Sequence, residues 1–236
     1  MNYQEFIANA NISTDRLCRE IYRANRGKIQ IKKEATVVRN LNRIFEATLK
    51  LSNEKGFQAM TMRDFSRETG LSLGALYAYF ASKDELLAMI LGQGREMVGR
   101  VLGEHLRAAR GPVDRLETAI RLHLYLTEAL QPWFYFSFME AKNMNPREKE
   151  KTIDSEMATD GLFAAILQEG QACGLFRPHD VALGAGAIKA LLQDWYVKRW
   201  KFSRRGISVD RYAEFILDCV MSYHVKDRRE APATCP

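Results

Sequence analysis

Residues 61–87, TMRDFSRETGLSLGALYAYFASKDELL, contain two short apolar-periodic segments separated by a glycine. Thr61 followed by Asp64 has the spacing of a helix start, and a second start of this kind follows at Ser82. Gly70 stands between the two segments, where a tight turn needs a residue that tolerates positive φ. The stretch therefore predicts a helix, a turn, a second helix and a newly capped third helix, which is the pattern of a DNA-reading helix-turn-helix.

The run GLSLGALYAYFASKDELL, with its paired Tyr77 and Tyr79, resembles the TetR-type transcriptional regulators. The resemblance extends back through RIFEATLKLSNEKGF at residues 43–57 and covers roughly residues 36–91. It implies an all-α fold, in which an N-terminal three-helix helix-turn-helix DNA-binding domain precedes a larger C-terminal helical domain for dimerisation and ligand binding. Beyond residue 91 the chain matches the family only in length and helical character.

Beyond residue 91 the spacing of apolar residues stays helical. Helices are expected over about 83–110, 113–130, 148–173, 179–202 and 208–226. The expected regions are an N-terminal extension (1–35), the helix-turn-helix domain (36–90), the ligand-binding and dimerisation domain (91–228) and a disordered tail (229–236).

The N-terminal extension allows two interpretations. Thr14 or Asp15 could cap a short helix that ends at Gly27, followed by the basic link KIQIKK at residues 28–33. The extension is either an arm that contacts the phosphate backbone or minor groove, or a helix packed on the body with a solvated linker.

Composition places the chain among ordinary globular proteins, with 47% hydrophobic and 27% charged residues. No apolar run is long enough to cross a membrane and the N-terminus lacks a signal-peptide layout, so we expect a cytoplasmic protein without a membrane partner. The scattered cysteines favour thiols over disulfides or a metal site, and the histidines are well separated. The cysteines are Cys18, Cys173, Cys219 and Cys235. We therefore expect no metal and no cofactor.

The positive charge is concentrated in the first half of the chain. Residues 1–95 contain 15 Lys/Arg and 10 Asp/Glu, whereas residues 96–236 contain 20 and 19. A basic excess beside the helix-turn-helix is what a phosphate-facing surface requires, since neutralising phosphates releases counterions.

The resemblance assigns DNA-contacting roles to residues of the helix-turn-helix. Leu73 and Ala75 depart from the common family pattern and lack hydrogen-bonding reach, but they could touch thymine methyl groups. Arg39 and Arg43 lie one turn apart on the preceding helix, where they either reach phosphates or are solvated. The predicted DNA-binding residues are Thr61, Ser72, Leu73, Gly74, Ala75, Tyr77, Tyr79, Lys83, Arg39 and Arg43.

A serine hydrolase and a non-specific DNA-architectural protein are the two alternatives to a DNA-binding regulator. GLSLG at residues 70–74 also matches G-x-S-x-G, the nucleophile elbow of serine hydrolases, but that motif needs a preceding strand and the preceding residues are helix-patterned. A non-specific DNA-architectural protein is the second alternative, and it would bind random duplex as well as promoter fragments. We expect a regulator and no enzyme.

An aromatic cluster at residues 133–139 lies in the domain that encloses a small-molecule cavity in the family. Plain core is the equal alternative for these side chains. The predicted ligand-binding residues are Trp133, Phe134, Phe136, Phe138, Met139 and His123.

The last two predicted helices correspond to the pair that forms a four-helix dimer interface in family members. Dimerisation would set two recognition helices about one turn of DNA apart, matching a pseudo-palindromic operator. The resemblance thus implies a homodimeric, ligand-responsive repressor whose partners are operator DNA, a second copy and an apolar or amphipathic effector. The predicted interface residues are Ile188, Leu191, Leu192, Trp195, Tyr212, Phe215, Ile216, Cys219 and Val220.

Overall fold

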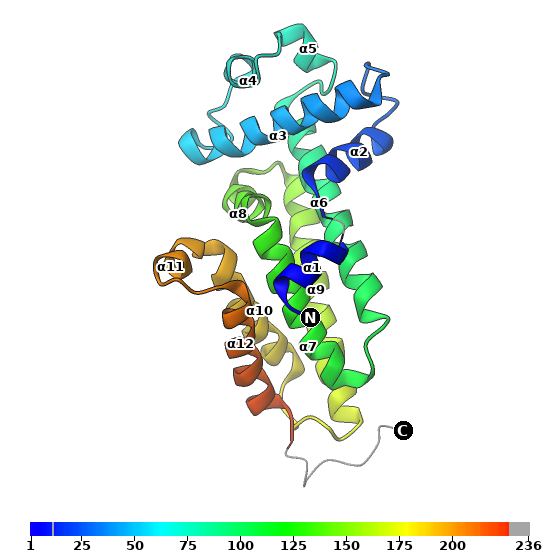
Figure 1. Ribbon diagram of the computed structural model, residues 1–236, viewed down its shortest axis with the longest axis vertical. Helices are drawn as coiled ribbons and strands as arrows, with labels where there is room; N and C mark the ends of the chain where they lie inside the picture. Colours follow the sequence, from blue (N-terminus) through cyan, green and yellow to red (C-terminus); the bar gives the residue numbers. More distant parts are fainter. Residues whose placement is uncertain (11, 227–236) are drawn as a thin grey trace. The chain divides into compact units, whose positions relative to one another are not determined.

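Helices make up most of residues 1–10 and 12–226, the part of the chain that the computed structural model describes, and no β-strand occurs among them (Figure 1). This confirms the predicted all-α fold, while the predicted tail lies outside the described residues. The helices are α1 (Tyr3–Ala10), α2 (Thr14–Ala24), α3 (Glu34–Lys55), α4 (Met62–Thr69), α5 (Leu73–Tyr77), α6 (Lys83–Leu106), α7 (Gly111–Ala129), α8 (Gln131–Glu140), the 3-10 helix η1 (Ala141–Asn143), α9 (Pro146–Ala172), α10 (Val181–Val197), α11 (Arg199–Arg204) and α12 (Val209–His224).

The chain forms two compact units. Unit 2 consists of Asn9–Val98 and Pro132–Lys151, and unit 1 consists of Met1–Ala8, Gly99–Gln131 and the described part of Thr152–Pro236. Helices α6 and α9 each run through both units. The helix-turn-helix and the aromatic helix α8 therefore belong to the same unit, whereas α7, α10 and α12 belong to the other. The domain limits drawn from the sequence stay predictions.

In unit 2 the three predicted helices of the DNA-binding domain enclose a small apolar core. Phe65 of α4 and Phe80 meet edge to face at 6.3 Å between ring centroids, and Leu76 of α5 is fully buried beside them. The buried side of α3 covers this pair, with Leu41 and Ile44 fully buried. Because these contacts join residues of one short stretch, the local pattern was sufficient to predict them.

The aromatic cluster at residues 133–139 lies on a helix, α8, that packs within unit 2. Trp133 is buried against α6 and donates from Nε1 to the Ile90 carbonyl oxygen at 3.1 Å. Phe136 packs edge to face on Phe57 at 5.9 Å. The Trp133 ring fits because Gly94 has no side chain: a Cβ there would lie 2.1 Å from Trp133 Cε2.

We expect Gly94→Ala to destabilise the protein by about 2 kcal/mol, since an extra methyl would overlap a buried indole that cannot shift without losing its hydrogen bond. Gly99→Ala on the same helix is the matched control, because a Cβ there meets nothing within 4 Å. That control should gain about 0.5–1 kcal/mol from helix propensity. Urea unfolding followed by circular dichroism measures both changes, and equal stability of the two variants would contradict the packing described.

Unit 1 contains an aromatic core between α10, α11 and α12. Trp195 stacks on Tyr212 at 5.0 Å and lies 4.9 Å from Phe202. Arg199 binds the Glu128 carboxylate through Nε at 2.7 Å and Nη2 at 2.8 Å. The helix predicted over 179–202 is wrong in its length, because it breaks at residue 198 into α10 and α11, and this break turns Phe202 back onto Trp195.

The cysteine prediction holds only in part. Cys18 is a buried thiol whose pKa is raised to about 12, first by burial and then by Asp15, and Cys219 is an exposed thiol. Cys173 is disulfide-bonded, so the thiol prediction is wrong for this residue. Sulfur proximity is a tertiary property that sequence spacing does not show. Cys235 lies outside the described residues.

Over the described ranges, no helix combines the length and apolar character needed to span a bilayer. Over the same ranges, no group of three or more His, Cys, Asp or Glu residues is placed to hold a metal ion.

Candidate DNA-binding site

The first helix of the candidate site, α4, begins with a complete capping box. Thr61 Oγ1 accepts from the Asp64 amide at 3.2 Å, and the Asp64 carboxylate accepts from the Thr61 amide at 2.9 Å. Lys55 pairs with the same carboxylate at 2.6 Å, and the hydrogen bonds from Lys55 and Thr61 lower the pKa of Asp64. Thr61 thus fixes the start of α4, and its predicted phosphate contact stays a proposal.

The turn between α4 and α5 is held by side chains as well as by glycine. Gly70 adopts φ +65°, Ser66 Oγ donates to the Leu71 carbonyl oxygen at 2.7 Å, and the Leu71 amide donates to Thr69 Oγ1 at 3.2 Å. Ser72 then caps α5, with Oγ accepting from the Ala75 amide at 3.2 Å. A helix, not a strand, precedes Ser72, so the nucleophile-elbow alternative is contradicted.

The first turn of α5 faces solvent. Leu73 is 39% exposed and Tyr77 is 49% exposed, while Ser72 and Gly74 are also exposed and Ala75 is half-buried. A short helix with an apolar buried residue and an open first turn is the part of a helix-turn-helix that enters the major groove. The structure therefore brings these five predicted contact residues together on one accessible surface.

Tyr79 does not belong to this surface, and its prediction as a DNA contact is corrected. Its side chain is 1% exposed, and its hydroxyl accepts from Asn40 Nδ2 at 2.8 Å. Burial raises the pKa of Tyr79. Because α5 ends at Tyr77, the two tyrosines do not share a face: one points outward and the other enters the core between α3 and α5.

Lys83, at the start of α6, ties the helix-turn-helix together. Its Nζ donates to the carbonyl oxygens of Gln58 at 2.8 Å and Phe57 at 3.3 Å, and it lies 5.5 Å from the Phe57 ring centroid. An ammonium has three donors, so two carbonyl bonds leave one for a phosphate. The predicted contact of Lys83 with the DNA phosphate backbone stays a proposal. Its observed role is structural, because it binds the two carbonyl oxygens.

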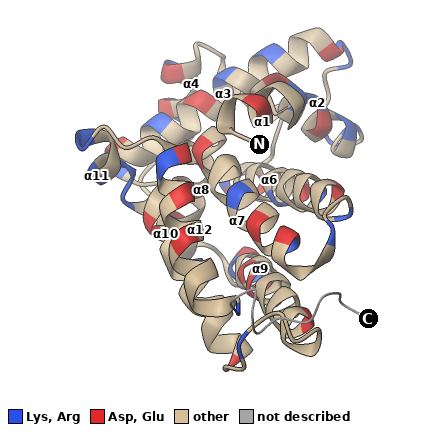
Figure 2. Ribbon diagram, turned by 60° about the horizontal axis from the view of Figure 1, so that its bottom comes forward, with Lys and Arg blue, Asp and Glu red and all other residues tan. Residues whose placement is uncertain are grey.

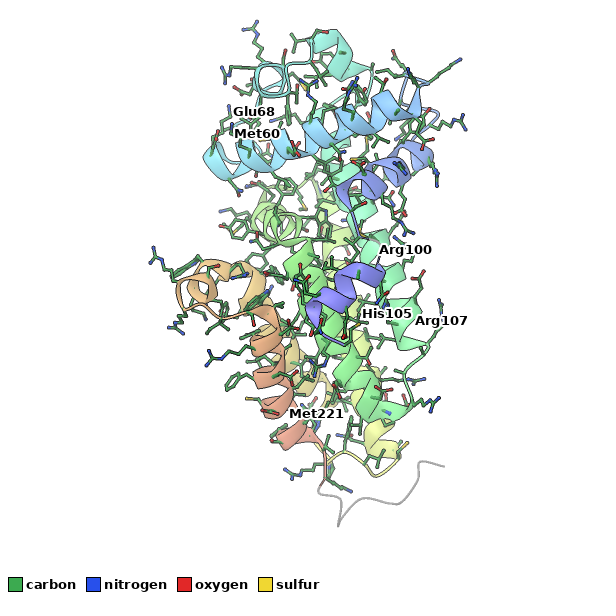
Figure 3. The ribbon with its side chains drawn as sticks, viewed as in Figure 1. Met60, Glu68, Arg100, His105, Arg107 and Met221 are labelled. Atoms are coloured by element: carbon green, nitrogen blue, oxygen red, sulfur yellow. The ribbon has the colours of Figure 1, made fainter. Side chains whose placement is uncertain are left out.

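The two predicted arginines of α3 are exposed. Arg43 Nη2 lies 3.0 Å from the place where a Cβ of Gly70 would be, so its guanidinium reaches the turn between α4 and α5. Arg39 lies one turn earlier on the same helix. The carboxylate of Glu68 on α4 (Figure 3) pairs with Lys50 of α3 at 2.7 Å. Arg43 is thus the better placed of the two to reach phosphates at this surface.

The predicted ligand-binding residues are not gathered in one place. Trp133 and Phe136 are buried in the core of unit 2, so for these two the plain-core alternative holds. Phe138 and Met139 are each 43% exposed, and Phe134 is half-buried. The sixth residue, His123, belongs to unit 1.

His123 is one member of a polar cluster, which we define as the buried His123 and Lys189 together with the exposed Glu156 and the half-buried Asp160. Lys189 is 6% exposed and pairs through Nζ with Glu156 Oε1 at 2.9 Å. Burial, and then the charge of Lys189, lower the pKa of His123, which is therefore neutral at pH 7. Asp160 lies one turn after Glu156, and its Oδ1 is buried with no hydrogen bond to the described residues.

Three members of this polar cluster are not among the predicted site residues, although the sequence contains a signal for one of them. Lys189 interrupts the buried stripe of α10 that contains Ala185 and Leu192, and a lysine at a core position is rarely left without a function or a partner. Glu156 and Asp160 gave no such signal, because α9 is charged over its whole first half.

The predicted dimer residues divide into two groups. Leu191 is 39% exposed, Phe215 is 62% exposed and Cys219 is exposed. The other six are buried within the chain, at 8% exposure or less, so their assignment to a surface is wrong; they are Ile188, Leu192, Trp195, Tyr212, Ile216 and Val220. Each packs in the core of unit 1.

The described chain is all-helical, and its α4 and α5 are each capped at the start and joined by a glycine turn. With the open first turn of α5, these features define a helix-turn-helix DNA-binding protein. Comparison with known proteins agrees with this class. Residues 44–90 match the family described as "Bacterial regulatory proteins, tetR family", and residues 109–223 match "Tetracyclin repressor-like, C-terminal domain".

The chain is 43% identical to the HTH-type transcriptional regulator PksA of Bacillus subtilis (strain 168) over 204 residues, which cover 82% of this chain and 94% of PksA. The chain belongs to the TetR family of bacterial regulatory proteins, and it is a transcriptional regulator.

Two solved structures show the same fold. One is the ketosteroid transcriptional regulator KstR2 of Mycobacterium tuberculosis (TM-score 0.71, 22% identity, 80% of this chain and 96% of that one). The other is AibR in complex with isovaleryl coenzyme A and operator DNA (TM-score 0.66, 18% identity, 78% of this chain and 97% of that one).

Proposed function

We propose that the protein is a cytoplasmic homodimeric repressor that binds a pseudo-palindromic operator and is released by an amphipathic small molecule. The observation that carries the DNA-binding part is the open first turn of α5, held in place by the Ser72 cap and the structured turn before it. Each protomer would place this turn in one major groove, with Tyr77 and Arg43 beside it and Lys83 facing the backbone.

The homodimer is supported by one exposed face of α10. Its solvent-facing residues are apolar and carry no charge over two turns, and Leu183 at the start of this face is 73% exposed. A surface helix normally shows polar residues to water, so an uncharged face indicates that something covers it. The face consists of Leu183, Gly186, Ala187, Ala190 and Leu191.

A second copy of this chain is the covering partner that we propose. On α12, Phe215, Cys219 and Tyr223 repeat every four residues and are all exposed, with Phe215 at 62% and Tyr223 at 59%. The glycine and alanines of α10 would let a symmetry-related helix approach closely, while the aromatic residues of α12 supply large contact areas. A two-fold axis would then pair α10 and α12 with their copies.

The effector would bind in unit 1 at the polar cluster. Asp160 Oδ1 is a buried acceptor with no donor among the described residues, and the buried Phe163 and Leu167 lie one and two turns further along α9. A molecule with an apolar body and a hydrogen-bond donor at one end would satisfy it. Such a molecule releases DNA only if it binds more tightly to a state whose recognition helices do not fit the operator.

In vitro selection from a random duplex library tests the proposed function. A specific regulator should enrich one pseudo-palindromic sequence and bind it about 10³-fold more tightly than random duplex. Binding of all duplexes with equal affinity would instead support the DNA-architectural alternative. Binding of no duplex would overturn the proposal.

We expect Asp160→Leu to stabilise the free protein by about 1 kcal/mol, because it removes a buried acceptor that has no donor among the described residues and keeps the branching at Cγ. Asp154→Leu, at an exposed position of the same helix, is the control and should change stability by less than about 0.5 kcal/mol. Urea unfolding measures both variants. A loss of stability in Asp160→Leu would show that the carboxylate serves the fold and not a ligand.

A further inference from the structure

The excess positive charge of the N-terminal half comes from one short segment. Residues 23–33, which we call the basic segment, contain five cations and no Asp or Glu. The other residues among the first 95 contain 10 Lys/Arg and 10 Asp/Glu, so they are neutral as a set. The cations are Arg23, Arg26, Lys28, Lys32 and Lys33.

The basic segment is fixed at its start by α2, which packs on α3. Leu17, Cys18, Ile21 and Tyr22 of α2 are buried, and Cys18 Sγ donates to Asn42 Oδ1 of α3 at 3.0 Å. The helix is capped by Ser13 and ends at Ala24, so the expected caps at Thr14 or Asp15 and the end at Gly27 are each displaced by one to three residues. Of the two interpretations of the extension, the packed helix is thus correct for α2.

The basic segment itself is docked along its length. Ile29 is 4% exposed, and its amide donates to the Asn25 carbonyl oxygen at 3.0 Å. Tyr22 donates from its hydroxyl to the Lys32 carbonyl oxygen at 3.0 Å, and Lys28 pairs with Glu85 of α6 at 3.1 Å. A segment held at three points has already lost most of its conformational entropy, so binding through it would cost little ordering.

One hydrogen bond places the basic segment beside the recognition helix. The Gln30 amide donates to the carbonyl oxygen of Ala78 at 3.0 Å, and Ala78 follows the last residue of α5. Helix α5 has five residues and so is about 7.5 Å long, which keeps the segment close to its open first turn. Figure 1 draws the loop between α2 and α3 at the N-terminal end of α3.

The two lysines that follow this hydrogen bond are free to bind an anion. Lys32 and Lys33 are both exposed, and neither forms an ion pair with any residue that the structure describes. In Figure 2 the lysines and arginines of the loop that enters α3 are blue. A duplex whose major groove holds α5 would bring a phosphate backbone past this loop.

We propose that Lys32 and Lys33 of the docked basic segment bind DNA phosphates that flank the base pairs contacted by α5. This inference rests on the proposed DNA-binding function and extends it to the N-terminal extension. The lysines act as point charges on the backbone and read no bases, so they raise affinity without narrowing the operator sequence.

The test compares K32Q/K33Q with a matched double variant, R107Q/R110Q, which removes two exposed charges from unit 1 (Arg107 in Figure 3). Binding to the selected duplex, or to random duplex if none is selected, is measured by fluorescence anisotropy between 50 and 300 mM KCl. Each neutralised phosphate contributes about −0.9 to the slope of log K against log salt. K32Q/K33Q should therefore reduce the slope by about 1.8 per bound protomer and lower affinity at least about tenfold.

A second duplex tests the flanking position. Shortening the duplex at both ends to the base pairs contacted by α5 should bring the wild type and K32Q/K33Q to the same affinity. Thermal unfolding of both double variants should match the wild type, which excludes loss of fold as the cause. An unchanged slope for K32Q/K33Q on the full duplex would overturn this inference alone, whereas a wild type that binds no duplex would overturn the proposed function as well.

Discussion

Phe215→Glu should convert the protein from a dimer to a monomer and weaken operator binding by about 10²-fold or more, since the two half-sites are then no longer bound by one linked molecule. Phe215 is 62% exposed on α12, between Arg211 and Cys219, and in a two-fold interface it would meet its own copy or a close neighbour. A glutamate at this place would bury two like charges, and it would also remove the largest apolar group of the face.

Sedimentation velocity at micromolar concentration measures the dimer, and anisotropy on the selected operator measures the affinity. Met157→Glu is the control, because Met157 is 61% exposed on α9 and receives the same charge outside the α10 and α12 faces. The control should remain a dimer with wild-type affinity. If Phe215→Glu stays a dimer with full affinity, the covered face lies elsewhere and the proposed interface is wrong.

Tyr77→Ala should lower operator affinity by about 10²-fold in the dimer while leaving the oligomeric state unchanged. A contact of this kind is worth about 1.5 kcal/mol, and a dimer loses two of them. Tyr77 is 49% exposed and projects from the last turn of α5, so its removal takes away a contact without opening the core.

Tyr79→Phe provides the matched comparison at the neighbouring tyrosine. It removes only the hydroxyl that accepts from Asn40, so it should cost about 1 kcal/mol of stability and leave operator affinity unchanged. Anisotropy and urea unfolding on the same preparations separate the two effects. The surface assignment fails if Tyr79→Phe loses affinity and Tyr77→Ala does not.

The helix-turn-helix was predictable from the sequence because its signals are local. The capping pair at Thr61 and Asp64 and the glycine at residue 70 each act within four residues, and the structure contains both as predicted. The Ser72 cap of α5 is a signal of the same local kind. The core residues Phe65, Leu76 and Phe80 were predictable for the same reason, since helical periodicity over a short stretch fixes which side is buried.

The dimer face shows where periodicity stops being sufficient. Both α10 and α12 are apolar on two sides, one packed in unit 1 and one open, and a sequence pattern does not say which side the chain itself covers. The prediction therefore mixed buried residues such as Trp195 with exposed ones such as Phe215, and it omitted Leu183. Only the tertiary packing separates them, because burial depends on neighbours from α7 and α11.

The sequence by itself determined the helical fold, the helix-turn-helix and the family to which the chain belongs, because caps, turns and apolar spacing are properties of neighbouring residues. The tertiary structure decided that Tyr79 is core while Tyr77 is surface, that Trp133 fills the space over Gly94, that Lys189 is buried beside His123 and that the basic segment lies against the end of α5. Each of these facts joins residues far apart in the chain, and their contact energies depend on a packing that no local pattern encodes.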